Sequence, residues 1–241
     1  MNSNSKKREV ESAASLNKRL DLSFSNLSLL IRALTHSSYA NEHSDAVEDN
    51  ERLEFLGDAV LDFVVGGWAY HRFPDYKEGM LTKIRSTFVK NEQLAVLARR
   101  MDLGNALRLG RGEEASGGYD RENILGSAFE ALVGALYLDA GVEAVNEFMK
   151  PHLEWLKSNQ LDDLIDPKSE LQEITQSLKL GMPEYEMVKS TGPDHAKLYE
   201  VEVKVAGEVK GYGIGTSNKA AEQAAAKDAL DTNYQNYRTS L

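Results

Sequence analysis

Apolar and polar positions between Glu51 and Trp68 recur at helical spacing. The apolar positions share one side of such a helix, and they are Leu53, Leu56, Val60, Val64 and Trp68. Three acids, Glu51, Glu54 and Asp58, stand at i, i+3 and i+7 and therefore share another face. Like charges at this spacing destabilise a helix unless a cation neutralises them. The pattern predicts a helix that is anchored in a core and turns an acidic stripe toward a surface or cleft.

A second apolar stretch, Ile124 to Asp139, has one carboxylate in its interior, Glu130, among alanines, glycines and leucines. Such a carboxylate is costly unless it is paired or coordinated. One alternative is that the acids of the first helix form an ordinary solvated face, as charge runs usually do. Glu130 favours another interpretation, in which the two helices pack closely and bring Glu54, Asp58 and Glu130 around a hard cation such as Mg²⁺.

The pattern changes beyond Pro167, which disfavours helix at the preceding residue. Polar residues before it predict a linker over 159–166. The elements expected after it are a helix from Lys168 to Leu180, strands over Glu184 to Lys189, Tyr199 to Val205 and Glu208 to Ile214, and a helix from Ser217 to Leu230. Ser217 is a suitable N-cap for the last helix. The predicted order is αβββα.

Composition narrows the class of protein. The chain has 241 residues, enough for two domains, and no cysteine, which excludes disulfides and zinc–thiolate sites. The N-terminal region is polar and charged, and no stretch was expected to reach membrane-spanning length. We therefore expect a cytoplasmic protein with no membrane partner, whose residues 1–22 form a flexible tail, disordered or loosely helical.

Net charge argues against simple binding of nucleic acid. The chain has 28 Lys plus Arg against 38 Asp plus Glu, and residues 166–241 alone have nine basic and twelve acidic residues. Nucleic-acid-binding surfaces are usually basic. Binding RNA would therefore require positive charge to be sorted onto one face.

Six blocks of sequence resemble the nuclease domain of bacterial ribonuclease III in order and spacing. They are Leu34–Glu42, Glu51–Leu61, Tyr70–Pro74, Glu78–Thr82, Leu109–Glu114 and Phe129–Leu132. The resemblance implies an α+β protein of two domains, an all-α nuclease domain over 23–158 and a small αβββα domain over 167–236. It also implies a homodimer, in which Phe55 enters a pocket of the partner; an ordinary core position is the alternative for Phe55.

The C-terminal part is similar to double-stranded RNA-binding domains. The similarity rests on Pro167–Glu173, Gly192–His195 and Ser217–Ala225. It implies recognition of A-form shape through two minor grooves and the phosphates between them. The residues to which it gives these contacts are Gln172, Glu173, His195, Ser217 and Lys219. Family members commonly place more lysines beside Lys219, where this chain has Thr216 and Asn218, so weaker and less salt-sensitive binding is expected.

The resemblance implies a metal-dependent endoribonuclease that cuts double-stranded RNA, including ribosomal RNA precursors. Glu54, Asp58 and Glu130 would hold Mg²⁺, or Mn²⁺ as a substitute, and Asp58 and Glu130 would be the catalytic residues. The products would carry 5′-phosphate and 3′-hydroxyl ends with short 3′ overhangs. Glu78, Arg111 and Arg121 would lie on the substrate side, although a solvated loop explains these three equally well.

One departure from the family pattern concerns the metal site. The family usually has an aspartate three residues before the glutamate of the second helix, where this chain has Ser127. A hydroxyl is a weaker ligand than a carboxylate, so Ser127 is a weakened ligand position and a raised metal requirement is expected. The alternative function is a double-stranded RNA-binding protein on a nuclease scaffold with weakened or lost catalysis.

Overall fold

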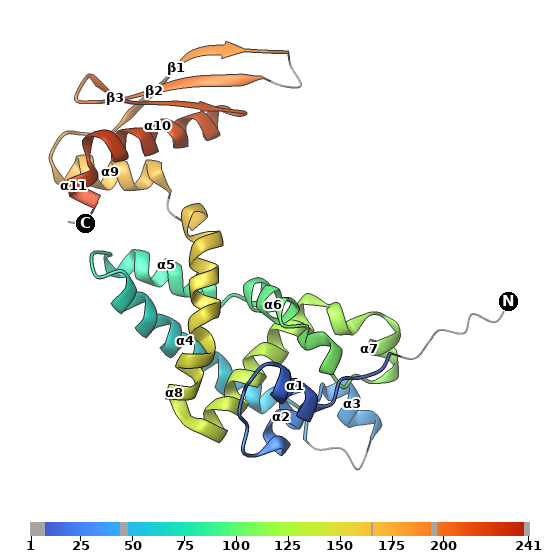
Figure 1. The fold of residues 1–241 in the computed structure, drawn as a ribbon. Helices are drawn as coiled ribbons and strands as arrows, with labels where there is room; N and C mark the ends of the chain where they lie inside the picture. The colour runs from blue at the N-terminus through green and yellow to red at the C-terminus, as the bar shows by residue number, and fades with distance from the viewer. Residues whose placement is uncertain (1–7, 44–47, 165, 194–196, 239–241) are drawn as a thin grey trace. The chain divides into compact units, whose positions relative to one another are not determined.

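A computed structural model of the chain describes residues 8–43, 48–164, 166–193 and 197–238, and divides the chain into two compact units. The first unit consists of residues 1–72 and 81–159, and the second of residues 73–80 and 160–241. The helical part contains, in order, α1 (Ala13–Arg19), α2 (Leu27–Ala33), α3 (Ser37–Glu42), α4 (Glu51–Arg72), α5 (Glu78–Phe88), α6 (Asn91–Arg100), η1 (Leu103–Ala106), α7 (Arg111–Ala115), η2 (Gly118–Asp120) and α8 (Glu122–Leu164) (Figure 1).

Helix α8 supplies much of the core of the first unit. Ala128, Phe129, Ala131, Leu132 and Val133 are fully buried. Contrary to the expectation above, the helical stretch 122–159 is long and apolar enough to cross a membrane by length and composition alone. A buried core helix passes the same test, and 61% of its most apolar window is buried inside the protein.

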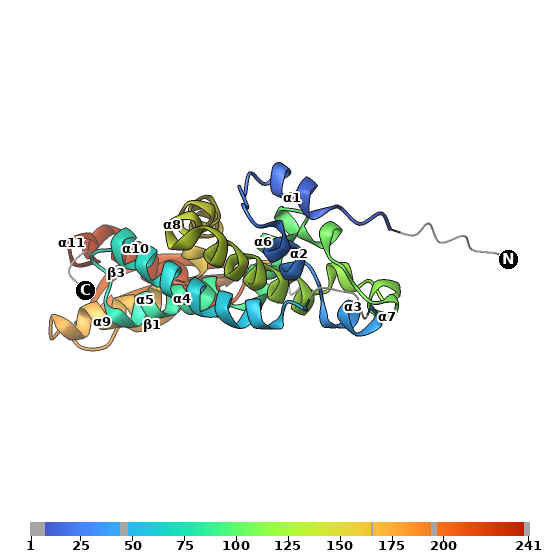
Figure 2. The same ribbon diagram turned by 90° about the horizontal axis from the view of Figure 1, so that it is seen from below.

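Two glycines set the distance between α4 and α8. A Cβ atom on Gly57 of α4 would lie 1.8 Å from the carbonyl oxygen of Glu130, and one on Gly134 of α8 would lie 2.3 Å from the carbonyl oxygen of Leu53. Neither position has room for a larger side chain. The helices therefore touch backbone to backbone, and both views draw α4 beside the first half of α8 (Figures 1 and 2).

Residues 8–22 include a helix, which the sequence left open, and they are attached to the rest of the first unit. Ser12 caps α1, and Leu16 of this helix is fully buried. Arg8 donates hydrogen bonds to both carboxylate oxygens of Glu114, at 2.8 and 2.9 Å, and to two backbone carbonyl oxygens at 2.6 and 2.7 Å. Nothing in the sequence signalled this attachment, because Arg8 and Glu114 are 106 positions apart and their pairing leaves no periodic signal.

The second unit has the predicted αβββα order. It contains α9 (Pro167–Ser177), β1 (Glu184–Thr191), β2 (Leu198–Val205), β3 (Glu208–Gly215), α10 (Asn218–Asn233) and a short α11 (Gln235–Arg238). The antiparallel sheet has the order β1-β2-β3, and α9 and α10 lie on the same side of it (Figure 1). The side chain of Ser217 accepts a hydrogen bond from the backbone N–H of Ala220, which confirms the predicted N-cap.

Small residues let α10 lie directly on β3. A Cβ atom on Gly213 would meet the backbone nitrogen of Ala225 at 2.2 Å. The core of the unit joins both helices to β2, and its fully buried members include Leu171, Ile174 and Val203. This packing fixes the starts of α9 and α10 on a common side of the sheet.

The boundary between the units falls between residues 159 and 160, at the start of the linker predicted over 159–166, but the chain is helical there. Helix α8 is broken at Gly141 (φ 82°, ψ −177°), and its second part continues to Leu164. The chain has no helix breaker between Asn159 and Pro167, which is consistent with a helix that continues past the boundary.

Candidate active site and nucleic-acid interface

The contact between α4 and α8 brings the predicted acidic residues together. Glu54 and Asp58 flank Gly57 on α4, and Gly57 touches the backbone of Glu130 on α8. Burial, followed by the negative charges of Glu54 and Asp58, raises the pKa of Glu130 to about 7. A carboxyl group that is half protonated near neutral pH is in electrostatic conflict with its neighbours.

No basic side chain relieves this conflict. Among the residues that the structure describes, no lysine, arginine or histidine forms a salt bridge with Glu54, Asp58 or Glu130. Asp62, the next acid on α4, differs because the guanidinium of Arg85 lies 3.7 Å from it. Three neighbouring carboxylates without a cationic partner are suitable ligands for a hard divalent cation.

Ser127 lies beside Glu54, as its place in the resemblance implied, but it acts there as a hydrogen-bond donor. Its hydroxyl donates a hydrogen bond of 2.9 Å to a carboxylate oxygen of Glu54. The serine therefore orients one of the candidate ligands, from a position 73 residues away in the chain. Nothing in the local sequence pattern signals such a contact.

Among the described residues, no group of three or more His, Cys, Asp or Glu side chains is arranged so that it could hold a metal ion by itself. Mg²⁺ usually keeps several waters and takes only one or two carboxylates together with substrate phosphates, so it does not require three protein ligands. Glu54, Asp58 and Glu130 are therefore candidate ligands for such a cation, one or two at a time.

Exposed aromatic side chains lie on α4 beside the acids. Phe55 is 81% exposed, Phe63 70% and Tyr70 67%. The alternative that Phe55 is an ordinary core residue is therefore wrong. Several large aromatic side chains exposed along one helix usually mark a protein interface.

The softer candidates have different surroundings. The side chain of Arg111 is 96% exposed, and its guanidinium lies 4.0 Å from the carboxylate of Glu42. Arg121 is engaged in a hydrogen-bonded ion pair of 2.6 Å with Glu113. Glu78 is the first residue of α5. Of the two arginines, Arg111 is the more accessible to a ligand.

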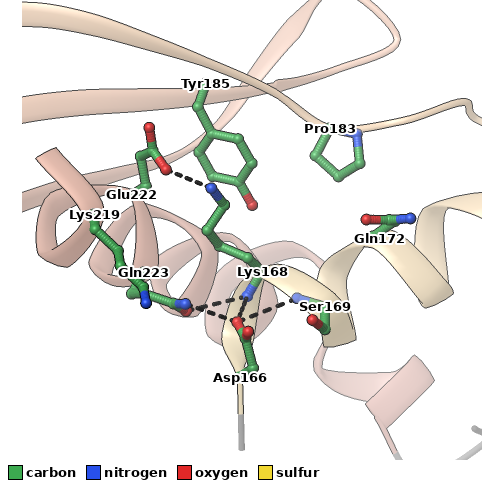
Figure 3. A pocket seen from close by; sticks show the side chains of 9 residues that line it. All are labelled: Asp166, Lys168, Ser169, Gln172, Pro183, Tyr185, Lys219, Glu222 and Gln223. Carbon is green, nitrogen blue, oxygen red and sulfur yellow. Dashed lines mark hydrogen bonds and ion pairs between the residues drawn. The ribbon is translucent and has the colours of Figure 1, made fainter.

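Four of the five predicted RNA-binding residues lie in described parts of the second unit. Gln172 and Glu173 are on α9, and Ser217 and Lys219 are at the start of α10. Gln172 and Lys219 line a common cavity of about 420 Å³ (Figure 3). His195 lies outside the described residues. The structure thus brings both helix starts to one side of the unit.

Negative charge in this unit gathers on another face. Along β2, Val201, Val203 and Val205 are buried toward the helices, so Glu200 and Glu202 point to the opposite face of the sheet. Glu202 stands directly across from Glu186 of β1. Lys204, at the next outward position of β2, pairs with Glu186. The face that the helices leave open therefore carries several of the unit's acids together with a paired lysine.

Comparison with protein families gives two matches along the chain. A family described as "Ribonuclease-III-like" matches residues 26–155, and a "Double-stranded RNA binding motif" matches residues 167–232. A protein named "Ribonuclease 3" from Azotobacter vinelandii is 48% identical over 90% of this chain and 95% of its own length. Another with that name, from Caldanaerobacter subterraneus subsp. tengcongensis, is 44% identical over 89% of this chain and 95% of its own length.

Solved structures match the helical part. The crystal structure of the nuclease domain of ribonuclease III from Campylobacter jejuni is 39% identical, with a TM-score of 0.53, and the match covers 58% of this chain and 92% of that one. A second structure of that domain covers 60% of this chain and 96% of its own, with the same identity and TM-score, and its title describes structural flexibility in a region involved in dimer formation.

Proposed function

Since the chain belongs to the ribonuclease III family of endoribonucleases, which act on double-stranded RNA, we propose that it hydrolyses RNA duplexes with Mg²⁺ held by Glu54, Asp58 and Glu130. The observation that carries this proposal is the group of three carboxylates without a basic partner among the described residues, together with the pKa of about 7 at Glu130. Mn²⁺ is expected to substitute for Mg²⁺.

The residues of the site would divide the work of binding and orientation. A bound cation supplies charge neutralisation at the phosphate and activation of a water. Glu130 must lose its proton to become a ligand, and its raised pKa places that loss near neutral pH. Ser127 holds the carboxylate of Glu54 in one orientation. We assign the catalytic role to Asp58 and Glu130, which the backbone contact at Gly57 keeps side by side.

The second unit would hold the duplex. We propose that Gln172, Glu173, Ser217 and Lys219 contact A-form RNA, and that His195, which lies outside the described residues, does so as well. The placement of both helix starts on one side of the unit supports this assignment. Because Asn218 stands where relatives commonly have a lysine, binding should depend less steeply on salt than in a domain with a full set of lysines.

The exposed stripe on α4 supports a homodimer. We propose that Phe55, with Phe63 and Tyr70, packs against a second copy of the chain, so that two active sites make offset cuts. Phe55→Asp should yield a folded monomer in sedimentation experiments, because a charge cannot be buried in an apolar interface without a large cost. Phe55→Leu is the matched control and should remain dimeric. A dimeric Phe55→Asp variant would exclude this face.

The natural substrates are proposed to be structured RNA precursors, ribosomal RNA among them, in the cytoplasm. The relatives named above are bacterial, and bacterial transcripts are made and processed in that compartment. The products should carry 5′-phosphate and 3′-hydroxyl ends.

A direct test compares a long RNA duplex, its separated single strands and a DNA duplex of the same sequence, each with and without Mg²⁺. The proposal expects cleavage of the RNA duplex alone, only with the cation, and end mapping should give 5′-phosphates and short 3′ overhangs. Equal cleavage of single strands, or 3′-phosphate products, would overturn it.

The alternative function, RNA binding without cleavage, is favoured by Ser127, which leaves the site one carboxylate short. Tight duplex binding with no cleavage at any Mg²⁺ or Mn²⁺ concentration, and cleavage restored by Ser127→Asp, would establish that alternative.

A further inference from the structure

Side chains in the cavity of the second unit connect the start of α9 to the start of α10. Asp166 caps α9 by accepting hydrogen bonds from the backbone N–H groups of Lys168 at 3.0 Å and Ser169 at 3.4 Å. The same carboxylate oxygen accepts a hydrogen bond of 2.8 Å from the side-chain amide of Gln223 on α10 (Figure 3). One carboxylate therefore serves both helices.

Gln223 completes the connection with its other end. Its side-chain oxygen accepts a hydrogen bond of 3.3 Å from the backbone N–H of Lys168. Burial opposes ionisation of Asp166, but the hydrogen bonds from Gln223 and from the α9 backbone lower the pKa of this carboxyl. Both ends of the Gln223 side-chain amide are therefore hydrogen-bonded to the start of α9. Its nitrogen donates to the Asp166 carboxylate, and its oxygen accepts from the Lys168 backbone.

A second bridge lies beside the first. The ammonium of Lys168 pairs with Glu222 of α10 and lies 4.4 Å from the centre of the Tyr185 ring. Glu222 also accepts a hydrogen bond of 2.7 Å from Asn218, in the first turn of α10. We name Asp166, Lys168, Glu222 and Gln223 the inter-helix bridge.

The inter-helix bridge lies between the two groups of proposed RNA contacts. Gln172 of α9 and Lys219 of α10 line the same cavity as its four members. Recognition of A-form shape requires contacts that are spaced to match two minor grooves and the phosphates between them. The relative position of α9 and α10 therefore decides whether these contacts can form together.

We propose that Gln223 is a positioning residue for double-stranded RNA, which acts by holding the start of α10 at a fixed distance and angle from α9. Lys168 and Glu222 support the same geometry. The inference rests on the proposed RNA contacts of the second unit, but not on cleavage.

Two observations favour a positioning role for Gln223 over direct contact with RNA and over a role in core packing. Both polar ends of the Gln223 amide are used within the protein, which leaves it poorly placed to contact RNA itself. Gln223 also lies outside the buried apolar cluster of the unit, which is formed by residues such as Leu171, Val203 and Ala225. Its contribution to the packed core is therefore small.

The test is Gln223→Met in the full-length chain, in a Glu130→Ala background with EDTA present so that binding is measured without cleavage. Methionine has a similar shape and no charge but cannot make the two hydrogen bonds. Affinity for an RNA duplex should fall about tenfold, the scale of one hydrogen bond to a charged group. The slope of log affinity against log salt should also become shallower, because fewer phosphates are engaged at once. Gln235→Met, on an exposed position of α11, is the matched control and should bind normally.

A double-mutant cycle with Lys219→Ala separates positioning from direct contact. Positioning predicts that Lys219→Ala costs clearly less affinity in the Gln223→Met background than alone, since the lysine is already displaced. Additive losses would mean that Gln223 contacts RNA itself, and would overturn the proposal. Unchanged affinity and salt slope with a lowered Tm would overturn it too, by showing a structural role only.

A second variant covers the case in which Gln223→Met does not fold. Gln223→Glu keeps an acceptor for the Lys168 backbone but cannot donate to Asp166, and it should show the same coupling to Lys219→Ala. Normal binding by a folded Gln223→Glu variant would contradict the proposal. Failure of the cleavage proposal would leave these binding results unaffected, so the two failures are distinguishable.

Discussion

Carboxylates in the two units are in opposite situations. Glu54, Asp58 and Glu130 crowd together without a basic partner among the described residues, and Glu130 responds with a raised pKa. Asp166 and Glu222, in the second unit, are each engaged by partners from a neighbouring helix. Uncompensated charge at a rigid helix contact is a setting in which a hard cation could bind, whereas compensated charge holds neighbouring elements together.

The largest effect should follow from breaking the backbone contact that creates the uncompensated site. In Gly57→Ala the new methyl group would lie 1.8 Å from the carbonyl oxygen of Glu130. We expect the free energy of unfolding to fall by about 3 kcal/mol or more, which corresponds to a Tm lower by roughly 6–12 °C. Gly67→Ala on the same helix, where nothing lies within 4 Å, is the control and should raise stability by roughly 0.5–1 kcal/mol. Similar Tm values for both variants would show that the helices can separate freely.

Adding a fourth carboxylate should sharpen the contrast. Ser127→Asp would place a charge beside Glu54, where a hydroxyl now donates a hydrogen bond. The metal concentration for half-maximal cleavage should fall roughly tenfold, the low end of what neighbours of metal ligands contribute. Ser127→Ala removes the hydrogen bond and adds no charge, so it should raise the metal concentration needed for half-maximal cleavage. The same metal requirement in both variants would remove Ser127 from the site.

A third effect concerns pH in the metal-free protein. The pKa of Glu130 is about 7 in the folded chain against 4.5 for the free side chain, so ionisation destabilises the fold as pH rises from about 4.5 to about 7. Glu130→Gln removes that destabilisation. Thermal unfolding in EDTA should therefore give a higher Tm for the variant above pH 7 and equal Tm values below about pH 4.5. A variant that is less stable at pH 8 would contradict the uncompensated charge.

The smallest effects are changes in the free energy of unfolding, and they should have opposite signs for acids in the two units. Asp58→Asn should stabilise the metal-free chain, because it reduces repulsion with Glu130. Glu222→Gln should destabilise it, because it weakens the pair with Lys168. Each change is expected to be within about 1 kcal/mol, since all these groups are partly exposed to solvent. If the denaturant midpoints of both variants shifted in the same direction from that of the native chain, the contrast between the two units would be contradicted.

Residue spacing predicted a large part of this molecule. The i, i+3, i+7 acids and the lone Glu130 were enough to indicate one site, and the alternation of valines and glutamates in β2 predicted the sheet. The hydrogen bond from Ser127 to Glu54 and the ion pair of Arg8 with Glu114 were not predictable, because each joins residues that only the tertiary fold brings together. The same holds for Gln223, which has the sequence setting of an ordinary helix residue.

The most direct measurement is single-turnover cleavage of a long RNA duplex over a Mg²⁺ titration by the native chain, Glu130→Ala and Asp62→Asn, at concentrations that saturate binding. The account predicts that Glu130→Ala slows cleavage at least about a thousandfold, equivalent to roughly 4 kcal/mol. Asp62→Asn, whose carboxylate already has Arg85 as a partner, should cleave within about threefold of the native rate. Native-like cleavage by Glu130→Ala would contradict the assignment of the active site.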